Sequence, residues 1–236
     1  MESLRRIAQV LWAPTETFRK IGERPTWAVI LVTLLVVGGI LGFVAVQKID
    51  PGDQRDMMRE TFEERGLRGE ELERSLDQAM AFNERFAPWF PAAGLCFGVF
   101  AYLLMALLFW GAFRLAGGEI DFVRSFAVTV HSFVPQGLSA LIAIPVVLGQ
   151  ESIDPEAAQR GSFLASNLGF LAPEGASPAL TAVLSSLDLF SLWAAILLIL
   201  GFAVVARVSK GVAAGVVVSA WIVWIGIKIG LAVLFT

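Results

Sequence analysis

Long apolar runs alternate with polar stretches along the chain, and five of these runs are long enough to cross a membrane. A membrane helix needs about 20 mostly apolar residues. The pattern predicts such helices at residues 27–46, 88–115, 126–148, 187–208 and 212–235. The predicted fold is therefore all-α: a polytopic membrane protein in which residues 26–236 form a five-span transmembrane helix bundle.

The first apolar run predicts a retained helix and not a cleaved signal peptide. It starts only at Trp27 and is followed by no small-residue cleavage site. The apolar region of a signal peptide is about 7–15 residues long, shorter than this run.

Composition changes the picture by excluding several classes of protein. Hydrophobic residues make up 56% of the chain and charged residues 17%, and the mean hydropathy is +0.71. A soluble domain has about 45–50% apolar and about 25% charged residues. The net charge of −3 gives no basic field for nucleic acid, so we expect no nucleic-acid partner. With one Cys and one His, we also expect no metal site and no cofactor.

The distribution of Lys and Arg predicts the orientation in the membrane. Nine basic residues lie in the N-terminal segment and in the two short connections on the same side, whereas eight are spread over the two longer loops 47–87 and 149–186. Basic residues are denser on the cytoplasmic side of membrane proteins. We therefore expect a cytoplasmic N-terminus and an outside C-terminus. The excess of Arg over Lys, with abundant Ala and Gly, favours a bacterial genome of high GC content, and we expect the bacterial inner membrane as the location.

The first 25 residues are predicted to form a cytoplasmic amphipathic segment. Residues 2–12 form an amphipathic helix that Pro14 ends, and Thr15 can cap a second short turn. Trp12, Phe18 and Ile21 would then lie at the level of the lipid headgroups. This segment is interpreted as an interfacial anchor; the alternative is a docking element for a cytoplasmic partner.

The two outer loops are predicted to contain helices as well. Residues 47–87 carry 18 of the 39 charged residues and predict a helical hairpin, 53–65 and 69–86, with Asp53 as N-cap and Gly66 as the stop. The hairpin caps the bundle or, alternatively, binds a partner helix. In the second loop, Ser177 followed by a proline predicts a helix start.

Polar side chains recur along the third span at helical spacing. Together with a helix-kinking proline and the single histidine, they form a candidate polar stripe: Ser125, Thr129, His131, Ser132, Pro135, Gln136 and Ser139. The stripe makes interhelical hydrogen bonds or, alternatively, lines a polar cavity. Lys228 in the fifth span is expected to extend to the outer interface; an ion pathway is the alternative.

Glycines four residues apart are candidates for close helix packing because they let backbones approach. The four pairs are Gly38/Gly42, Gly94/Gly98, Gly211/Gly215 and Gly226/Gly230. They predict a tightly packed bundle or an oligomer. No motif for a nucleophile, a phosphate loop or a zinc protease occurs, so we expect no enzyme activity.

Several phrases resemble the bacterial branch of the Yip (Ypt-interacting protein) domain family. They are the N-terminal stretch around Pro14 and Phe18, the third-span stretch at Pro135, and the stretch from Leu187 to Gly211 that contains Asp188, Trp193 and Gly201. The resemblance covers essentially the whole chain and implies five spans with the N-terminus inside. Eukaryotic relatives are implied to bind prenylated Rab GTPases, but the chain lacks their Asp-Leu-Tyr-Gly-Pro phrase.

These observations lead to one functional hypothesis with one alternative. We expect a non-enzymatic membrane scaffold or accessory subunit that binds the lipid bilayer and a membrane-protein partner or a second copy of itself. The alternative is a small transporter or channel that uses the polar stripe of the third span.

Overall fold

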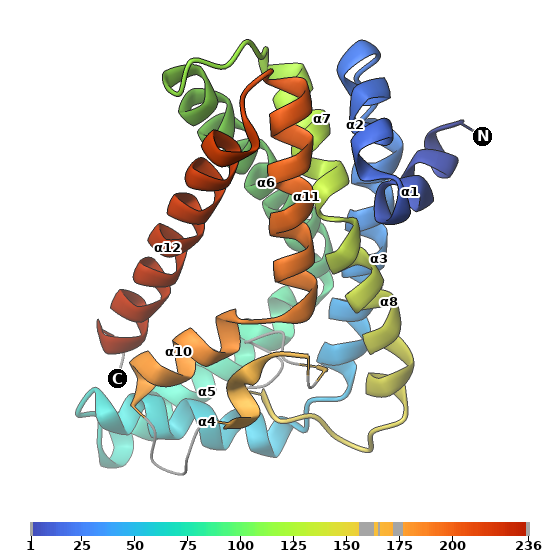
Figure 1. The fold of residues 1–236 in the computed structure, drawn as a ribbon. Coiled ribbons are helices and arrows are strands. Elements are labelled where there is room, and N and C mark those ends of the chain that lie inside the picture. Colours follow the sequence, from blue (N-terminus) through green and yellow to red (C-terminus); the bar gives the residue numbers. More distant parts are fainter. Residues whose placement is uncertain (1, 156–162, 165, 172–176, 235–236) are drawn as a thin grey trace. The chain divides into compact units, whose positions relative to one another are not determined.

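The computed structural model describes residues 2–155, 163–164, 166–171 and 177–234 (Figure 1). Helices account for the regular structure of these residues, and the described part contains no strand beyond an isolated bridge between Asn167 and Asp188. The elements are α1 (Glu2–Trp12), α2 (Pro14–Glu23), α3 (Ala28–Gln47), α4 (Pro51–Glu64), α5 (Gly69–Phe86), η1 (Ala87–Trp89), α6 (Phe90–Leu115), α7 (Phe122–Ser132), α8 (Val134–Leu148), η2 (Leu168–Leu171), α10 (Pro178–Ser186), α11 (Leu189–Val205) and α12 (Lys210–Leu234). The predicted all-α class is confirmed.

Four helical segments in the described part are long and apolar enough to cross a membrane. They are Ala28–Gln47, Ala92–Leu115, Phe122–Leu148 and Lys210–Gly230. A fifth apolar helix, Leu189–Val205, has 17 residues and is shorter than a standard span. The polytopic helical character is thus confirmed, and a membrane crossing by α11 stays a prediction.

The chain divides into two compact units. The first contains residues 1–36, 98–139 and 164–236, and the second contains residues 37–97 and 140–163. Aromatic rings fill the core of the first unit: the rings of Phe113 and Phe202 stack with centroids 4.2 Å apart, and Phe109 lies 5.2 Å from Phe202. Rings held this way give α6 and α11 a defined contact.

In the first unit, α2 lies against α7 and α11, and α10 lies against α12 (Figure 1). Phe18 and Ile21 of α2 are fully buried, whereas Trp12 is 69% exposed. Phe18 and Ile21 therefore face the protein core and not lipid, and their depth relative to the lipid headgroups stays a prediction. Thr15 is not the cap: α2 follows Ala13 directly, with Pro14 in its first turn.

The second unit contains the polar helical hairpin of α4 and α5 and a small apolar cluster of Ala45, Val147 and Ile153. The N-cap of α4 is Asp50, whose carboxylate accepts from the Gly52 backbone N at 2.7 Å, and not the predicted Asp53. Asp50 takes this place because Pro51 follows it and suits the first helical position. Gly66 stands in the connection with a φ of 90°, which suits a residue without a side chain. Ser177 caps α10 as predicted.

Candidate functional site

The hydroxyl groups of the third span are buried and hydrogen-bonded to backbone carbonyls. Ser125, Thr129 and Ser132 are each fully buried. Ser125 donates to the Ala106 carbonyl of α6 at 2.8 Å, whereas Thr129 and Ser132 each donate within α7 at 2.9 Å, to the carbonyls four residues before them. These bonds use the donors that a polar path would need, and the Ser125 bond ties α7 to α6.

His131 and Pro135 lie on either side of a break in the third span. His131 is 1% exposed, and its Nδ1 lies 2.8 Å from the Ala127 carbonyl oxygen. The helix is interrupted at Phe133, and Pro135 stands buried in the first turn of α8. A proline has no N–H to continue a helix through this point. The kink therefore falls within the candidate stripe.

Beyond the kink, Gln136 faces the start of α11. Its Nε2 donates to the Phe190 carbonyl at 3.2 Å, and its Oε1 is buried without a hydrogen-bond partner in the described part. Asp188 caps α11: its Oδ2 accepts from the backbone N of Ser191 at 2.8 Å and from the Ser191 hydroxyl at 3.0 Å. Its Oδ1 is also buried without a partner there. Ser139 is half-buried.

A second family-motif cluster joins α2 to α11. A Cβ built on Gly201 would lie 2.8 Å from Val128 Cγ1 and 2.9 Å from Phe18 Cε1. The absence of a side chain at Gly201 thus makes room for Phe18. Pro14 begins α2, and Trp193 packs on the rim of the same core. Phe18 and Gly201 are brought together, whereas Asp188 caps the other end of α11.

Among the eight predicted packing glycines, Gly98 is the one that lies in close contact with another described helix. A Cβ on Gly98 would lie 2.7 Å from Leu35 Cδ2, and one on Gly211 would lie 3.8 Å from the Ser209 hydroxyl. A Cβ would meet no described atom within 4 Å at the other six: Gly38, Gly42, Gly94, Gly215, Gly226 and Gly230. Close packing also occurs at two glycines without the predicted spacing, Gly137 and Gly201. A packing role for the other six glycines, within the bundle or against another chain, stays a prediction.

Lys228 of α12 contacts the end of α10. Its Nζ donates to the Ser186 hydroxyl at 2.9 Å, which joins α12 to the end of α10. A lysine within an apolar span needs such a polar partner.

The α4–α5 hairpin separates its charges onto different faces. Arg55 pairs with Glu73 at 3.0 Å and with Asp77 at 2.9 Å, and Arg59 pairs with Glu73 at 2.7 Å. The hydrogen bonds from Arg59 and Arg55 lower the pKa of Glu73, and those to Asp77 and Glu73 raise the pKa of Arg55. These exposed pairs contribute little stability individually, but they define which face of α4 meets α5.

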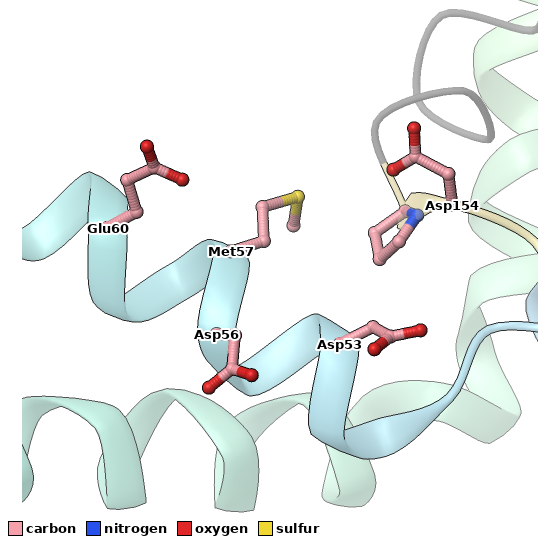
Figure 2. Close-up of a pocket in the computed structure, with 6 residues that line it drawn as sticks. Asp53, Asp56, Met57, Glu60 and Asp154 are labelled. Atoms are coloured by element: carbon pink, nitrogen blue, oxygen red, sulfur yellow. The ribbon is translucent and has the colours of Figure 1, made fainter.

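A groove of about 390 Å³ lies along another part of α4 (Figure 2). It is lined by Asp53, Asp56, Met57, Glu60, Asp154 and Pro155. Figure 2 shows Met57 and Glu60 projecting from α4 to the side on which Asp154 lies. No set of three or more acidic, His or Cys side chains in the described ranges is arranged to hold a metal ion.

The comparison with protein families decides the identity of the fold. The Yip1 domain matches residues 8–231. The chain belongs to the Yip1 domain family. The match includes the Phe18–Gly201 contact, the kink at Pro135 and the Asp188 cap, so all three lie within the family domain.

One relative of the chain is the Membrane protein YknW of Bacillus subtilis (strain 168). It is 23% identical over 204 residues, which cover 85% of this chain and 78% of the relative. No solved structure matches the chain. The predicted resemblance to the Yip family and its bacterial branch is confirmed.

Sequence reasoning missed how the N-terminal segment is held. Arg6 is 5% exposed, and its guanidinium donates to the Arg24 carbonyl at 3.1 Å and to the Thr26 hydroxyl at 3.0 Å. An arginine in an amphipathic helix is predicted to face solvent, and no local sequence pattern indicates a hydrogen-bond partner 18 or 20 residues away. One available signal was the break at Pro14, which lets the chain turn back on itself.

Proposed function

We propose that this Yip1-family membrane protein is a non-enzymatic scaffold or accessory subunit of a bacterial inner membrane, with its N-terminus in the cytoplasm. It would hold a membrane-protein partner or a second copy of itself, and organise the surrounding lipid. The observation that carries this proposal is the third span: its hydroxyl donors are used inside the bundle, so the polar stripe acts in packing.

The exposed surface of α12 supports an interaction role. Apolar side chains such as Ile222 and Trp224 are 64% and 58% exposed, and Gly215 and Gly226 have open space beside them. Lipid covers such a surface in a monomer, and a second helix can cover it in a complex because glycine permits close approach.

Cross-linking and affinity capture from native membranes, followed by native mass spectrometry in mild detergent, test the scaffold role. We expect a discrete assembly larger than the monomer. Gly215→Leu should weaken an assembly that forms through α12, because a large side chain would block close approach of a second helix. Val218→Leu on the same helix is the matched control, because it changes an exposed aliphatic side chain without replacing a glycine. Bare monomer together with empty captures would contradict the proposal.

The transporter alternative makes a different prediction for the same span. It requires water along residues 125–139, whereas packing requires protection. Single cysteines at Ser125, Ser132 and Gln136, in a Cys96→Ser background, can be tested with a membrane-impermeant thiol reagent. We expect uniform protection; labelling at Ser132 or Gln136 from one side would favour transport and refute the packing role.

A further inference from the structure

The contacts of α2 show the direction in which it runs. Phe18 lies beside Gly201, and Gly22 lies beside Val205, where an added Cβ would be 3.5 Å from Val205 Cγ2. Residue numbers therefore increase in the same direction along both helices, so α2 runs parallel to α11. The Gly22 carbonyl also accepts from Arg124 Nε at 2.7 Å, close to the start of α7. The C-terminal end of α2 therefore lies where α7 begins and α11 ends.

The same contacts place α2 relative to the apolar part of the first span. The apolar helix α3 begins at Ala28, and the ring of the preceding Trp27 packs edge-on against Phe126, with centroids 5.3 Å apart. Val128, two residues deeper in α7, meets Gly201 and thus lies level with Phe18. Pro14 is one helical turn before Phe18, about 6 Å farther from the Trp27 level. The start of α2 is thus the end that points into the apolar zone.

We propose that α1 and α2 form a re-entrant helical hairpin whose tip, residues 7–15, inserts into the lipid leaflet that surrounds the N-terminal end of α3. At this tip the indole of Trp12 contacts the acyl chains just below the headgroups.

The composition of the tip fits this environment. Residues 7–15 contain no charged side chain, and they are bounded by Arg5 and Arg6 on one side and by Glu16 on the other. Trp12 is 69% exposed in the protein alone. An exposed indole bounded by charged ends is the pattern of a helix that lies about 5–10 Å within the headgroup and acyl boundary. Glu16, the nearest charge of α2, is paired with Lys20 at 2.6 Å.

Both arms of the hairpin are fixed to the bundle, so the depth of the tip is fixed as well. Arg6 ties α1 to the α2–α3 connection through Arg24 and Thr26, and Val10 of α1 is fully buried. Phe18 holds α2 against Gly201. Since neither arm can swing outward without losing these contacts, the tip is held at the level that the register of α2 assigns to it.

Spin-label accessibility in reconstituted vesicles tests this placement. Single cysteines replace Trp12, Glu23 or Val36 in a Cys96→Ser background, and the labelled protein is placed in phosphatidylethanolamine–phosphatidylglycerol vesicles. Val36 is 50% exposed within α3 and serves as the lipid reference, whereas exposed Glu23 at the other end of α2 serves as the water reference. We expect the label at Trp12 to collide several-fold more with oxygen than with a water-soluble nickel chelate, as at Val36, and the label at Glu23 to do the reverse.

Two outcomes would overturn the proposal. Nickel accessibility at Trp12 equal to that at Glu23 would place the tip in water, and shielding from both reagents would place it against protein. If the cysteine variant fails to reconstitute, Trp12→Phe provides the second test. The difference between the wild-type and variant emission is the fluorescence of Trp12, and lipids with brominated acyl chains should quench it. Trp12 fluorescence that these lipids do not quench would contradict insertion. Failure here would leave the scaffold role untouched, because assembly mass and partner capture are separate readouts.

Discussion

Replacing Gly201 by alanine should destabilise the bundle, although alanine favours a helix. The added Cβ would lie 2.8–3.0 Å from Val128 Cγ1 and from two ring carbons of Phe18, and both of these side chains are fully buried. Relaxed carbon contacts are about 3.5–4.0 Å, so the neighbours must move by roughly half an ångström or more. Neither can turn into solvent. Overpacking of this kind costs about 1–3 kcal/mol.

The matched control is Gly111→Ala on α6, where no described atom lies within 4 Å of the new Cβ. In a helix interior, alanine is favoured over glycine by about 0.5–1 kcal/mol. We therefore expect a net loss of about 1 kcal/mol, with an upper limit of about 2.5 kcal/mol, at Gly201 and a gain of about 0.5–1 kcal/mol at Gly111. For a chain of this size, 1 kcal/mol corresponds to about 2–4 °C in Tm.

Tryptophan fluorescence during heating in dodecyl maltoside measures both variants against the wild type. Opposite shifts in apparent Tm are expected, and tryptic cleavage after Arg19 should be faster in Gly201→Ala because Phe18 is displaced. Equal upward shifts in the two variants, with unchanged cleavage, would refute the contact between α2 and α11.

Two further predictions concern single polar groups. The guanidinium groups of Arg59 and Arg55 hold the folded-state pKa of Glu73 below its ordinary value of 4.5. The stability that these ion pairs contribute is therefore complete above about pH 4.5 and is lost as the pH falls through the lowered folded-state pKa of Glu73. Glu73→Gln should make the apparent Tm less dependent on pH in this acid range. An unchanged dependence of Tm on pH would contradict the pairing. Asp188→Ala removes the cap acceptor for Ser191 and should cost about 1 kcal/mol, whereas Asp188→Asn keeps an oxygen and should behave like the wild type; equal losses in both would contradict the capping role.

Periodicity and run length predict the helices of this chain well because both depend on nearby residues. The helices predicted at residues 2–12 and 69–86, the second of which belongs to the polar hairpin, coincide with α1 and α5. Local sequence patterns fail to fix the exact start of a helix where two residues can both act as the N-cap. Asp53 and Asp50 are both acceptable caps, and the proline after Asp50 decides between them.

Which residues meet across the bundle could not be predicted from spacing. Two glycines four residues apart share a helix face, but spacing does not say whether that face meets lipid or another helix. Gly226 and Gly230 face open space, whereas Gly137, which has no glycine four residues away, would place a Cβ 2.6 Å from Leu34 Cδ2. The close approach depends on the large side chain opposite, and that side chain is far away in the sequence.

The polar stripe shows why composition alone leaves two functions open. Serine and threonine in a span have the same sequence pattern whether they face water or donate to the carbonyl four residues earlier. In α7 the second arrangement applies at Thr129 and Ser132, and Ser125 donates across to α6. Among the described residues, two buried side-chain oxygens near the start of α11 have no hydrogen-bond donor, the Gln136 Oε1 and the Asp188 Oδ1. A polar ligand that bound beside them would have to supply donors, so labelling at Gln136 is the most informative position in the cysteine test of the transport alternative.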